Sequence, residues 1–158
     1  MIFPYRPYEV QPTPWFPEGI VYRPTIPVRV ASAGRDTTVV SLVDTGADET
    51  VLPDFLVSYL GIETDTRKEA TFRGIGGQPV HGVFGDVTLE LQEGQRSYRW
   101  ETTVAFISGP TVAVLGRHGF LDHFRATFDD VQRKLHLQFY HKPRRRRRSK
   151  TGMPDRPV

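Results

Sequence analysis

A carboxylate stands directly after an apolar run in the first half of the chain. Residues 39–43 comprise four apolar residues and one serine, and Asp44, Thr45 and Gly46 follow at once. A carboxylate at the end of a buried strand costs free energy unless it is compensated, so its position needs a reason. Gly46 leaves room for another backbone or a ligand to approach. The pattern predicts either a catalytic carboxylate, whose chemistry is proton transfer, or a plain turn that begins with Asp.

Glycines gather in a second segment, residues 71–80, at positions 74, 76 and 77. Apolar residues on both sides and glycines at the apex predict a mobile β-hairpin that can close over a cleft as a lid. A plain surface hairpin is the alternative. The segment lacks the Gly-Lys-Ser/Thr ending of a phosphate-binding loop, so that function is not indicated.

A third pattern is the apolar run of residues 112–115, which ends at Gly116 and is followed by Arg117. An arginine at the edge of a buried site needs a carboxylate partner. Asp48, four residues after Asp44, is the candidate partner.

The elements that must position these residues are short strands. Runs rich in Val, Thr, Ile and Phe, separated by turn residues, are typical of a predominantly β domain of sandwich or barrel type. The predicted strands are residues 26–31, 37–43, 69–73, 83–92, 98–107, 111–115 and 134–140. Apolar spacing also predicts two short helices, over residues 53–60 and 117–124, the second weakened by Gly119.

Both ends of the chain differ from this β domain, which is predicted to span residues 26–140. Seven of the thirteen prolines fall in the first 27 residues, so residues 1–25 are predicted to form an extended arm. The arm is either a loose leader or a segment that lies along its own domain or a partner. Residues 141–158 are predicted to be a disordered basic tail.

The net charge of +3 is a property of that tail. Residues 141–158 carry +7, so residues 1–140 carry −4. The run from Arg144 to Arg148 is either a solvated tail or a contact for nucleic acid or another anionic surface. The absence of cysteine excludes disulfides and a cysteine nucleophile. No run reaches the ~18 apolar residues of a membrane span, so a cytoplasmic or otherwise soluble location is expected.

Residues 42–52, the glycines of the hairpin tip at 74–77, and residues 114–117 resemble, in this order, the retroviral-type aspartic proteases, or retropepsins. The resemblance covers roughly residues 25–140. It implies an all-β fold: a small closed β-barrel-like subunit with one short C-terminal helix, active as a homodimer. It also implies an aspartic endopeptidase that hydrolyses peptide or protein substrates with an activated water and uses no metal or other cofactor.

The resemblance also implies residue roles. Asp44 would pair with Asp44 of a second subunit and share one proton with it. Thr45 would hydrogen-bond across the dimer axis, and Gly46 would let the substrate backbone approach. Asp48 would form an ion pair with Arg117, and the strand at residues 134–140 would join the dimer-interface sheet. The substrate-binding residues implied in this way are Ala47, Asp48, Glu49, Val51, Gly74, Ile75, Gly76, Val112 and Val114.

Some features depart from the family pattern. Arg73 precedes the hairpin tip, where many members have a small residue, and neither the arm nor the tail has a counterpart. The alternative function is a catalytically silent dimerisation or peptide-binding module of the same fold, with a basic tail that contacts nucleic acid or an anionic surface. The intact Asp-Thr-Gly sequence at Asp44 favours the enzyme.

Overall fold

Strands make up most of the fold, which is taken from a computed structural model that describes residues 1–73, 77, 79–109 and 112–140. In chain order the elements are β1 (Ile2–Pro4), β2 (Arg6–Glu9), β3 (Ile20–Arg23), β4 (Thr25–Ser32), β5 (Arg35–Val43), β6 (Val51–Pro53), α1 (Phe55–Leu60), β7 (Thr64–Arg73), β8 (Pro79–Glu93), β9 (Arg96–Ile107), β10 (Ala113–Leu115), β11 (Phe124–Asp129) and β12 (Lys134–Phe139). The prediction of an all-β fold is confirmed.

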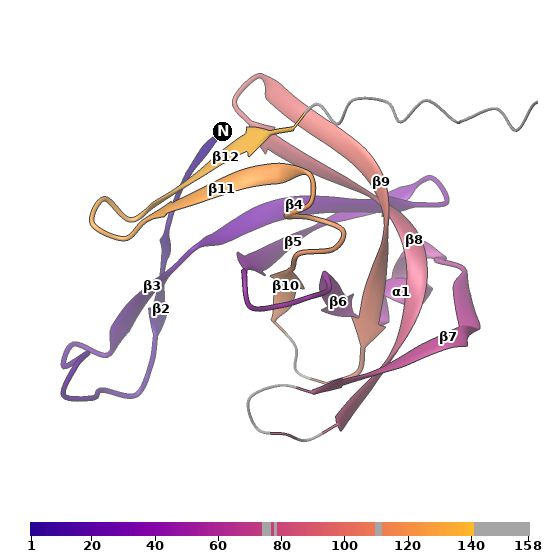
Figure 1. The fold of residues 1–158 in the computed structure, drawn as a ribbon, viewed down its shortest axis with the longest axis horizontal. Helices are drawn as coiled ribbons and strands as arrows, with labels where there is room; N and C mark the ends of the chain where they lie inside the picture. Colours follow the sequence, from indigo (N-terminus) through magenta and orange to yellow (C-terminus); the bar gives the residue numbers. More distant parts are fainter. Residues whose placement is uncertain (74–76, 78, 110–111, 141–158) are drawn as a thin grey trace, which may run out of the picture.

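The main sheet closes on itself as a barrel (Figure 1). Its strand order is β4-β5-β10-β6-β9-β8-β7, and β4 also pairs with β8, which closes a ring of six strands. β7 pairs only with β8 within this sheet and therefore lies outside the ring. The closed ring leaves few free strand edges, as a small barrel requires.

Alternating burial explains why these residues form barrel strands. In β8, Val87, Leu89 and Leu91 are buried, and the residues between them face outward. Side chains of successive strand residues point to opposite faces, so this pattern gives one face to the core. β4 has the same alternation, with Ile26, Val28 and Val30 inside. The sequence pattern of these two strands therefore determines which face of each strand points into the core of the barrel.

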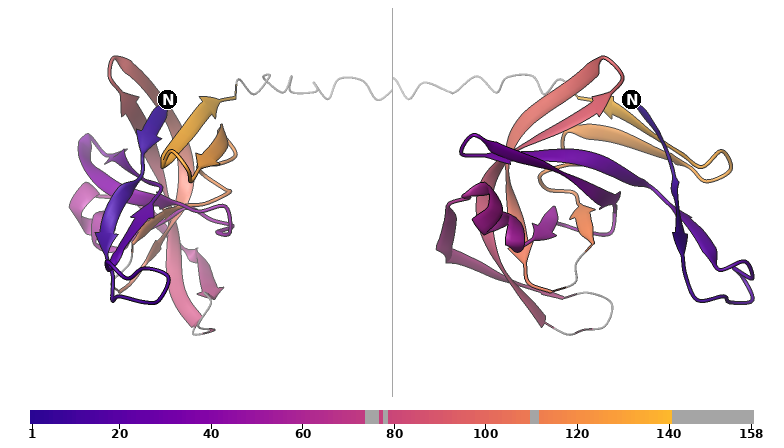
Figure 2. Two further views of the ribbon diagram at one scale, coloured as in Figure 1. Left: turned by 90° about the vertical axis from the view of Figure 1, so that its left-hand side faces the viewer. Right: turned by 180° about the vertical axis from the view of Figure 1, so that it is seen from behind.

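A second sheet, of order β1-β12-β11, covers one end of the barrel (Figures 1 and 2). An aromatic cluster joins it to β9: the Trp100 ring lies 5.3 Å from the Phe124 ring and 5.9 Å from the Phe120 ring. The indole N–H of Trp100 donates to the Gly119 carbonyl oxygen at 2.9 Å. Aromatic burial of this kind contributes strongly to stability, and the hydrogen bond satisfies the one polar atom of Trp100.

The first strand of the N-terminal arm, β1, packs on its own domain. β1 pairs with β12 in the register Phe3↔Leu135, and Phe3 and Tyr5 are buried. Burial, followed by interaction with Asp130, raises the pKa of Tyr5 to about 12. β2 and β3 form a separate two-stranded hairpin. The prolines exclude helix here, as predicted, but they are compatible with these edge and two-stranded positions.

The helix predicted over residues 53–60 is confirmed as α1, but the predicted short C-terminal helix over residues 117–124 is wrong. That segment is a series of turns, and α1 is the one α-helix among the described residues. Gly119 has a positive φ of 89°, a conformation that no right-handed helix contains. The Leu121 amide donates to the Gly116 carbonyl oxygen at 3.0 Å, and the Asp122 amide donates to that of Arg117 at 2.9 Å. Each bond spans five residues, whereas the bonds of an α-helix span four.

The seven predicted strands correspond to β4, β5, β7, β8, β9, β10 and β12. β10 is shorter than predicted, Ala113–Leu115, and residue 111 lies outside the described residues. The division into arm, domain and tail stays a prediction, and residues 141–158 lie outside the described part of the chain. Within that part, no helix is long and apolar enough to cross a membrane.

Candidate active site

Asp44 is the first residue after β5 and lies at the end of the central strands of the barrel. Its backbone N–H donates to the Leu115 carbonyl oxygen at 3.1 Å, which continues the pairing of β5 with β10. Its side-chain Oδ1 accepts a hydrogen bond from the Gly46 N–H at 2.8 Å. The carboxylate is half-buried, so it is both oriented and accessible. An oriented carboxylate at a strand end can take a proton from a bound molecule or give one to it.

The strands around Asp44 have an unusual order that supports this position. β10 runs parallel to β5, with Leu115 opposite Val43, and antiparallel to β6, with Val114 opposite Val51. The chain leaves the barrel at Asp44 and returns at Val51. β10 therefore pairs with the strands on both sides of the loop and holds its two ends together.

Gly116 permits a close approach between two backbone segments of the site. A Cβ atom on Gly116 would lie 2.2 Å from the Glu49 carbonyl oxygen and 2.9 Å from that of Ala47. No side chain fits at such distances, so only glycine lets the two backbone segments touch. Beside it, the Arg117 amide donates to Ala47 and the His118 amide donates to Asp48, each at 2.8 Å to the carbonyl oxygen. These bonds tie the loop after Asp44 to the residues that follow β10.

Thr50 completes the support and was not predicted from sequence. It is fully buried; its hydroxyl donates to the His118 carbonyl oxygen at 2.8 Å and accepts from the Gly116 N–H at 3.2 Å. The Thr50 amide also donates to the same His118 oxygen at 3.0 Å. Buried polar groups need such partners. The one sequence signal was a threonine directly before the apolar pair at 51–52.

The structure places Asp48 and Arg117 together at the surface. A guanidinium nitrogen of Arg117 lies 3.9 Å from Asp48 Oδ1, and the two side chains are 70% and 90% exposed. An ion pair this long and this exposed is screened by water and contributes little to stability. The backbone bonds described above therefore do more to hold these two segments than the charges do.

The other predicted site residues lie around Asp44 in different environments. Thr45 and Gly46 are exposed, and Ala47 and Glu49 are half-buried. Glu49 Oε2 is out of contact with solvent and has no hydrogen-bond partner among the described residues, an arrangement that costs free energy. Val51 and Val114 are half-buried neighbours, Val112 is 53% exposed, and Gly74, Ile75 and Gly76 lie outside the described residues.

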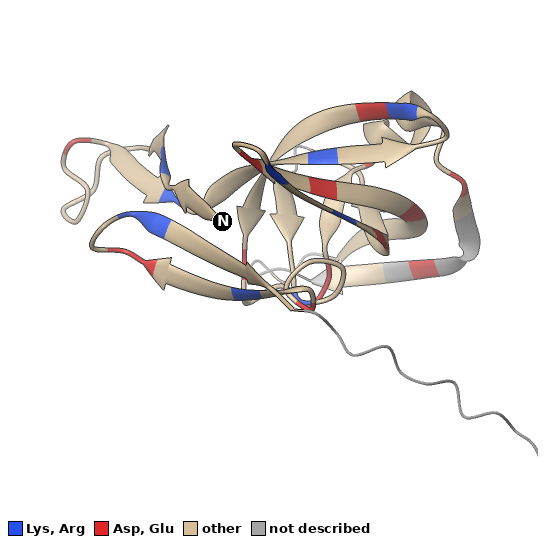
Figure 3. Cartoon of the chain, turned by 90° about the horizontal axis from the view of Figure 1, so that it is seen from above, with Lys and Arg blue, Asp and Glu red and all other residues tan. Residues whose placement is uncertain are grey.

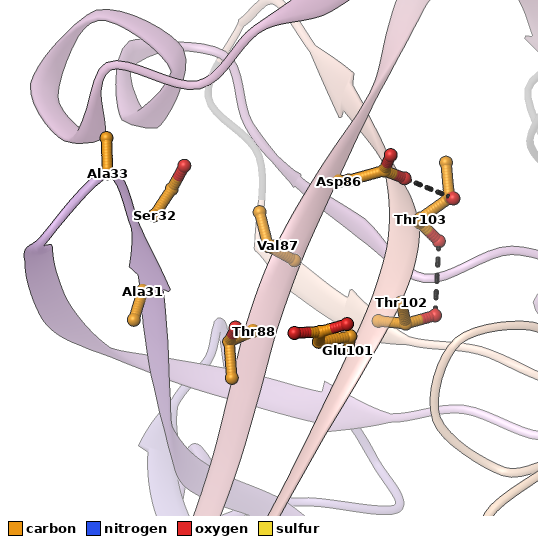
Figure 4. A pocket seen from close by; sticks show the side chains of 9 residues that line it. All are labelled: Ala31, Ser32, Ala33, Asp86, Val87, Thr88, Glu101, Thr102 and Thr103. Carbon is orange, nitrogen blue, oxygen red and sulfur yellow. Dashed lines mark hydrogen bonds between the residues drawn. The ribbon is translucent and has the colours of Figure 1, made fainter.

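A hollow of about 480 Å³ lies elsewhere on the barrel (Figure 4). It is lined by the end of β4 and by parts of β8 and β9, and the hydroxyl of Thr103 donates to Asp86 there at 2.5 Å. It contains none of the predicted site residues. Basic and acidic side chains are interspersed on the described elements (Figure 3), and no group of three or more His, Cys, Asp or Glu among them is placed to hold a metal ion.

Comparison with known proteins identifies the class to which this barrel and its Asp-Thr-Gly loop belong. The model of the family "Retroviral aspartyl protease" matches residues 21–127, and the chain belongs to this family. The family match supports aspartic protease activity in general.

Among solved structures, the chain is similar to the EIAV protease complexed with the inhibitor HBY-793. The two are 28% identical over 60% of this chain and 82% of that chain, with a TM-score of 0.44. No curated protein matches the chain.

Proposed function

We propose that the protein is an aspartic endopeptidase that is active as a homodimer. The single observation that carries the proposal is Asp44 itself, a half-buried carboxylate that β10 and the Gly46 amide orient at the end of β5. The chain contains one Asp-Thr-Gly sequence, so a pair of aspartates needs two chains. Membership of the retroviral aspartyl protease family supports the same conclusion.

In the dimer, Asp44 would face the partner subunit's Asp44. Two carboxylates at such close range cannot both be ionised, so they hold one proton between them. The ionised carboxylate takes a proton from a water molecule as that water attacks the peptide carbonyl carbon. The protonated carboxylate transfers its proton to the carbonyl oxygen, which becomes a hydroxyl in the tetrahedral intermediate. The carboxyl group that took the proton from water then gives it to the amide nitrogen as the C–N bond breaks, and one hydroxyl returns its proton to the other carboxylate, which restores the pair.

The residues beside Asp44 would keep this geometry and receive the substrate. Thr45, exposed beside Asp44, would hydrogen-bond across the dimer axis. Gly46 would let the substrate backbone pass close. Rigid support of this kind keeps catalytic groups within a few tenths of an ångström of their working positions.

Substrate recognition would combine apolar pockets with main-chain hydrogen bonds. Glu49, which is half-buried, would contact the bound peptide at the same flank as Asp48. Asp48, with Arg117 beside it, would contact the substrate flanks. The apolar pockets would be lined by Ala47, Val51, Val112 and Val114, and the hairpin residues Gly74, Ile75 and Gly76 would close over the peptide.

The alternative of a catalytically silent module of the same fold is not favoured. The basic run from Arg144 to Arg148 lies outside the described residues, and its contact with nucleic acid or another anionic surface stays a prediction. If that contact exists, removal of residues 141–158 should abolish it and leave peptidase activity intact, because no predicted site residue lies in the tail.

Asp44→Asn tests the proposal. Asparagine has nearly the same shape and can still accept from the Gly46 N–H, so the chain should fold and dimerise. It cannot serve as a proton acceptor, so cleavage of a mixed peptide library should fall by 10²-fold or more, on the order expected for loss of a general acid or base.

The matched control is Asp86→Asn, since Asp86 lies on β8 in the hollow of Figure 4 and should not affect the rate. Products are identified by mass spectrometry across a range of pH. Undiminished cleavage by the Asp44→Asn chain would contradict the proposal.

A further inference from the structure

The β2–β3 hairpin projects from the barrel as an ordered ribbon (Figures 1 and 2). Its strands pair from Arg6↔Arg23 to Glu9↔Ile20. Beyond the strands, the Val10 N–H donates to the Gly19 carbonyl oxygen at 2.8 Å. At the tip, the amides and carbonyl oxygens of Thr13 and Phe16 bond to each other in both directions, at 3.0 and 3.2 Å. The ribbon is therefore hydrogen-bonded to its end, so its tip is held in a defined shape.

This ribbon exposes large apolar side chains. Trp15 at the tip is 86% exposed and Phe16 is 48% exposed, and along β3 Ile20 and Tyr22 are 40% and 41% exposed. An isolated two-stranded hairpin is only marginally stable in water. Tryptophan side chains presented in this way are typical anchors of protein interfaces. The ribbon thus has the properties of a surface that another protein covers.

The base of the ribbon is fixed next to the catalytic aspartate. The Pro24 carbonyl oxygen accepts from the Val43 N–H at 3.0 Å, and Val43 directly precedes Asp44. Thr25, the first residue of β4, lies opposite Leu42. The Tyr8 hydroxyl and Thr25 Oγ1 are 3.0 Å apart, and the Arg133 guanidinium lies 3.6 Å from the Tyr22 ring centre. The ribbon therefore leaves the barrel at the end of β5 in a set direction, and α1 lies on the opposite side of the barrel (Figure 1).

We propose that the β2–β3 hairpin is an arm that packs against the partner subunit, with Trp15 and Phe16 as its anchor. The inference rests on the proposed function, because a pair of Asp44 side chains requires a second chain at the end of β5. A second subunit that docks at the end of β5 therefore contacts the hairpin, because the base of the hairpin is hydrogen-bonded to Val43, the residue before Asp44. Two-fold symmetry makes the contact reciprocal, so each subunit is held by the hairpin of the other.

The first test measures dimer dissociation in an Asp44→Asn background, which prevents self-cleavage. Trp15 and Phe16 are both changed to Ser, and sedimentation equilibrium gives the Kd. We expect the Kd to rise roughly tenfold or more, as when an aromatic anchor is removed from an interface. Phe55→Ser in the same background is the matched control, because Phe55 is a 61% exposed aromatic residue on α1. An unchanged Kd in the double variant overturns the proposal.

The second test uses the intact hairpin and does not depend on how a variant folds. The chain has two tryptophans, and Trp100 is 6% exposed. In the Asp44→Asn dimer, Trp15 should be shielded from acrylamide quenching, and dilution to the monomer should expose it. The Trp15→Phe chain, in which Trp100 alone emits, should show no such change. Equal quenching of Trp15 in dimer and monomer overturns the proposal.

Neither measurement uses peptidase activity, so the two proposals can fail separately. A dimer with a buried Trp15 that cleaves no peptide would overturn the proposed function and leave the arm in place. A chain that stays monomeric at every concentration would overturn both the arm and the shared aspartate pair. If the catalytically intact Trp15→Ser, Phe16→Ser chain has a raised KM for peptide but an unchanged Kd, the hairpin binds substrate, and the proposal is wrong.

Discussion

At the scale of single residues, the contact under the loop that follows Asp44 depends on the absence of a side chain at Gly116. A Cβ on Gly116 would lie 2.2 Å from the Glu49 carbonyl oxygen and 2.5 Å from its carbonyl carbon, both backbone atoms. Gly116→Ala should therefore displace the loop that follows Asp44. We expect the free energy of unfolding to fall by about 2 to 3 kcal/mol, as for other overpacked sites, and peptidase activity to fall with it. Denaturant unfolding measures the first quantity.

The control for this change is Gly94→Asn. Gly94 has a φ of 58° and open space where a Cβ would be, and asparagine tolerates that conformation. Its effect should stay within about 1 kcal/mol. Equal losses at Gly116 and Gly94 would show that the close approach to Glu49 is unimportant.

Sequence patterns predicted where Asp44 and Gly116 lie in the fold better than the bonds around them. Asp44 and Gly116 stand in local motifs, and each directly follows a strand, β5 and β10 respectively, as those motifs predicted. Thr50 acts through the carbonyl oxygen of His118 and the amide of Gly116, 66 or more residues away. Backbone partners at such separations leave no trace in local spacing, so the role of Thr50 required the fold.

At the scale of elements, β1 contributes to the hydrophobic core although it lies in the proline-rich arm. Phe3 is 7% exposed and packs into the core cluster, whereas its neighbour Ile2 is 49% exposed. Phe3→Ala should lower the free energy of unfolding by about 3 kcal/mol through lost burial and the cavity that remains. Ile2→Ala, on the other face of the same strand, should cost less than about 1 kcal/mol. Thermal or denaturant unfolding of the two variants makes the comparison.

If Phe3→Ala is as stable as Ile2→Ala, the arm is dispensable, and the predicted domain boundary at residue 26 describes the folding unit. A large loss would instead place that boundary at the first residues of the chain. Both variants keep the backbone pairing of β1 with β12. A difference in stability between them therefore reports the burial of the Phe3 side chain and decides between the two boundaries.

The strands that sequence alone predicted are those with clear alternation, such as β8, where every second residue from Val87 to Leu91 is buried. β6 was missed because three residues that end in proline, Val51–Pro53, carry no period. Residues 117–124 were predicted to be helical because Phe120, Leu121 and Phe124 fit helical spacing. The positive φ of Gly119 overrides that spacing, and turns bring Phe120 and Phe124 to the core.

At the scale of the whole molecule, the proposed active site is divided between two chains, and this has a quantitative consequence. When wild-type chains are mixed with an equal amount of Asp44→Asn chains above the dimer Kd, random pairing places half of the wild-type chains in mixed dimers. A mixed dimer contains Asp44 in only one of its two subunits and should be inactive. Peptidase activity at fixed wild-type concentration should therefore fall to about one half, and a larger excess of the variant should lower it further.

The matched control is a triple variant that combines Asp44→Asn with Trp15→Ser and Phe16→Ser, added to the wild-type chain in the same amount. Its weakened dimerisation should make it a poorer inhibitor at the same concentration, because it competes less well for wild-type partners. A monomeric enzyme would keep full activity in either mixture, since no chain would depend on another for its second aspartate. Activity that is unaffected by excess Asp44→Asn chain, in samples shown to exchange subunits, would therefore place the complete active site within one chain.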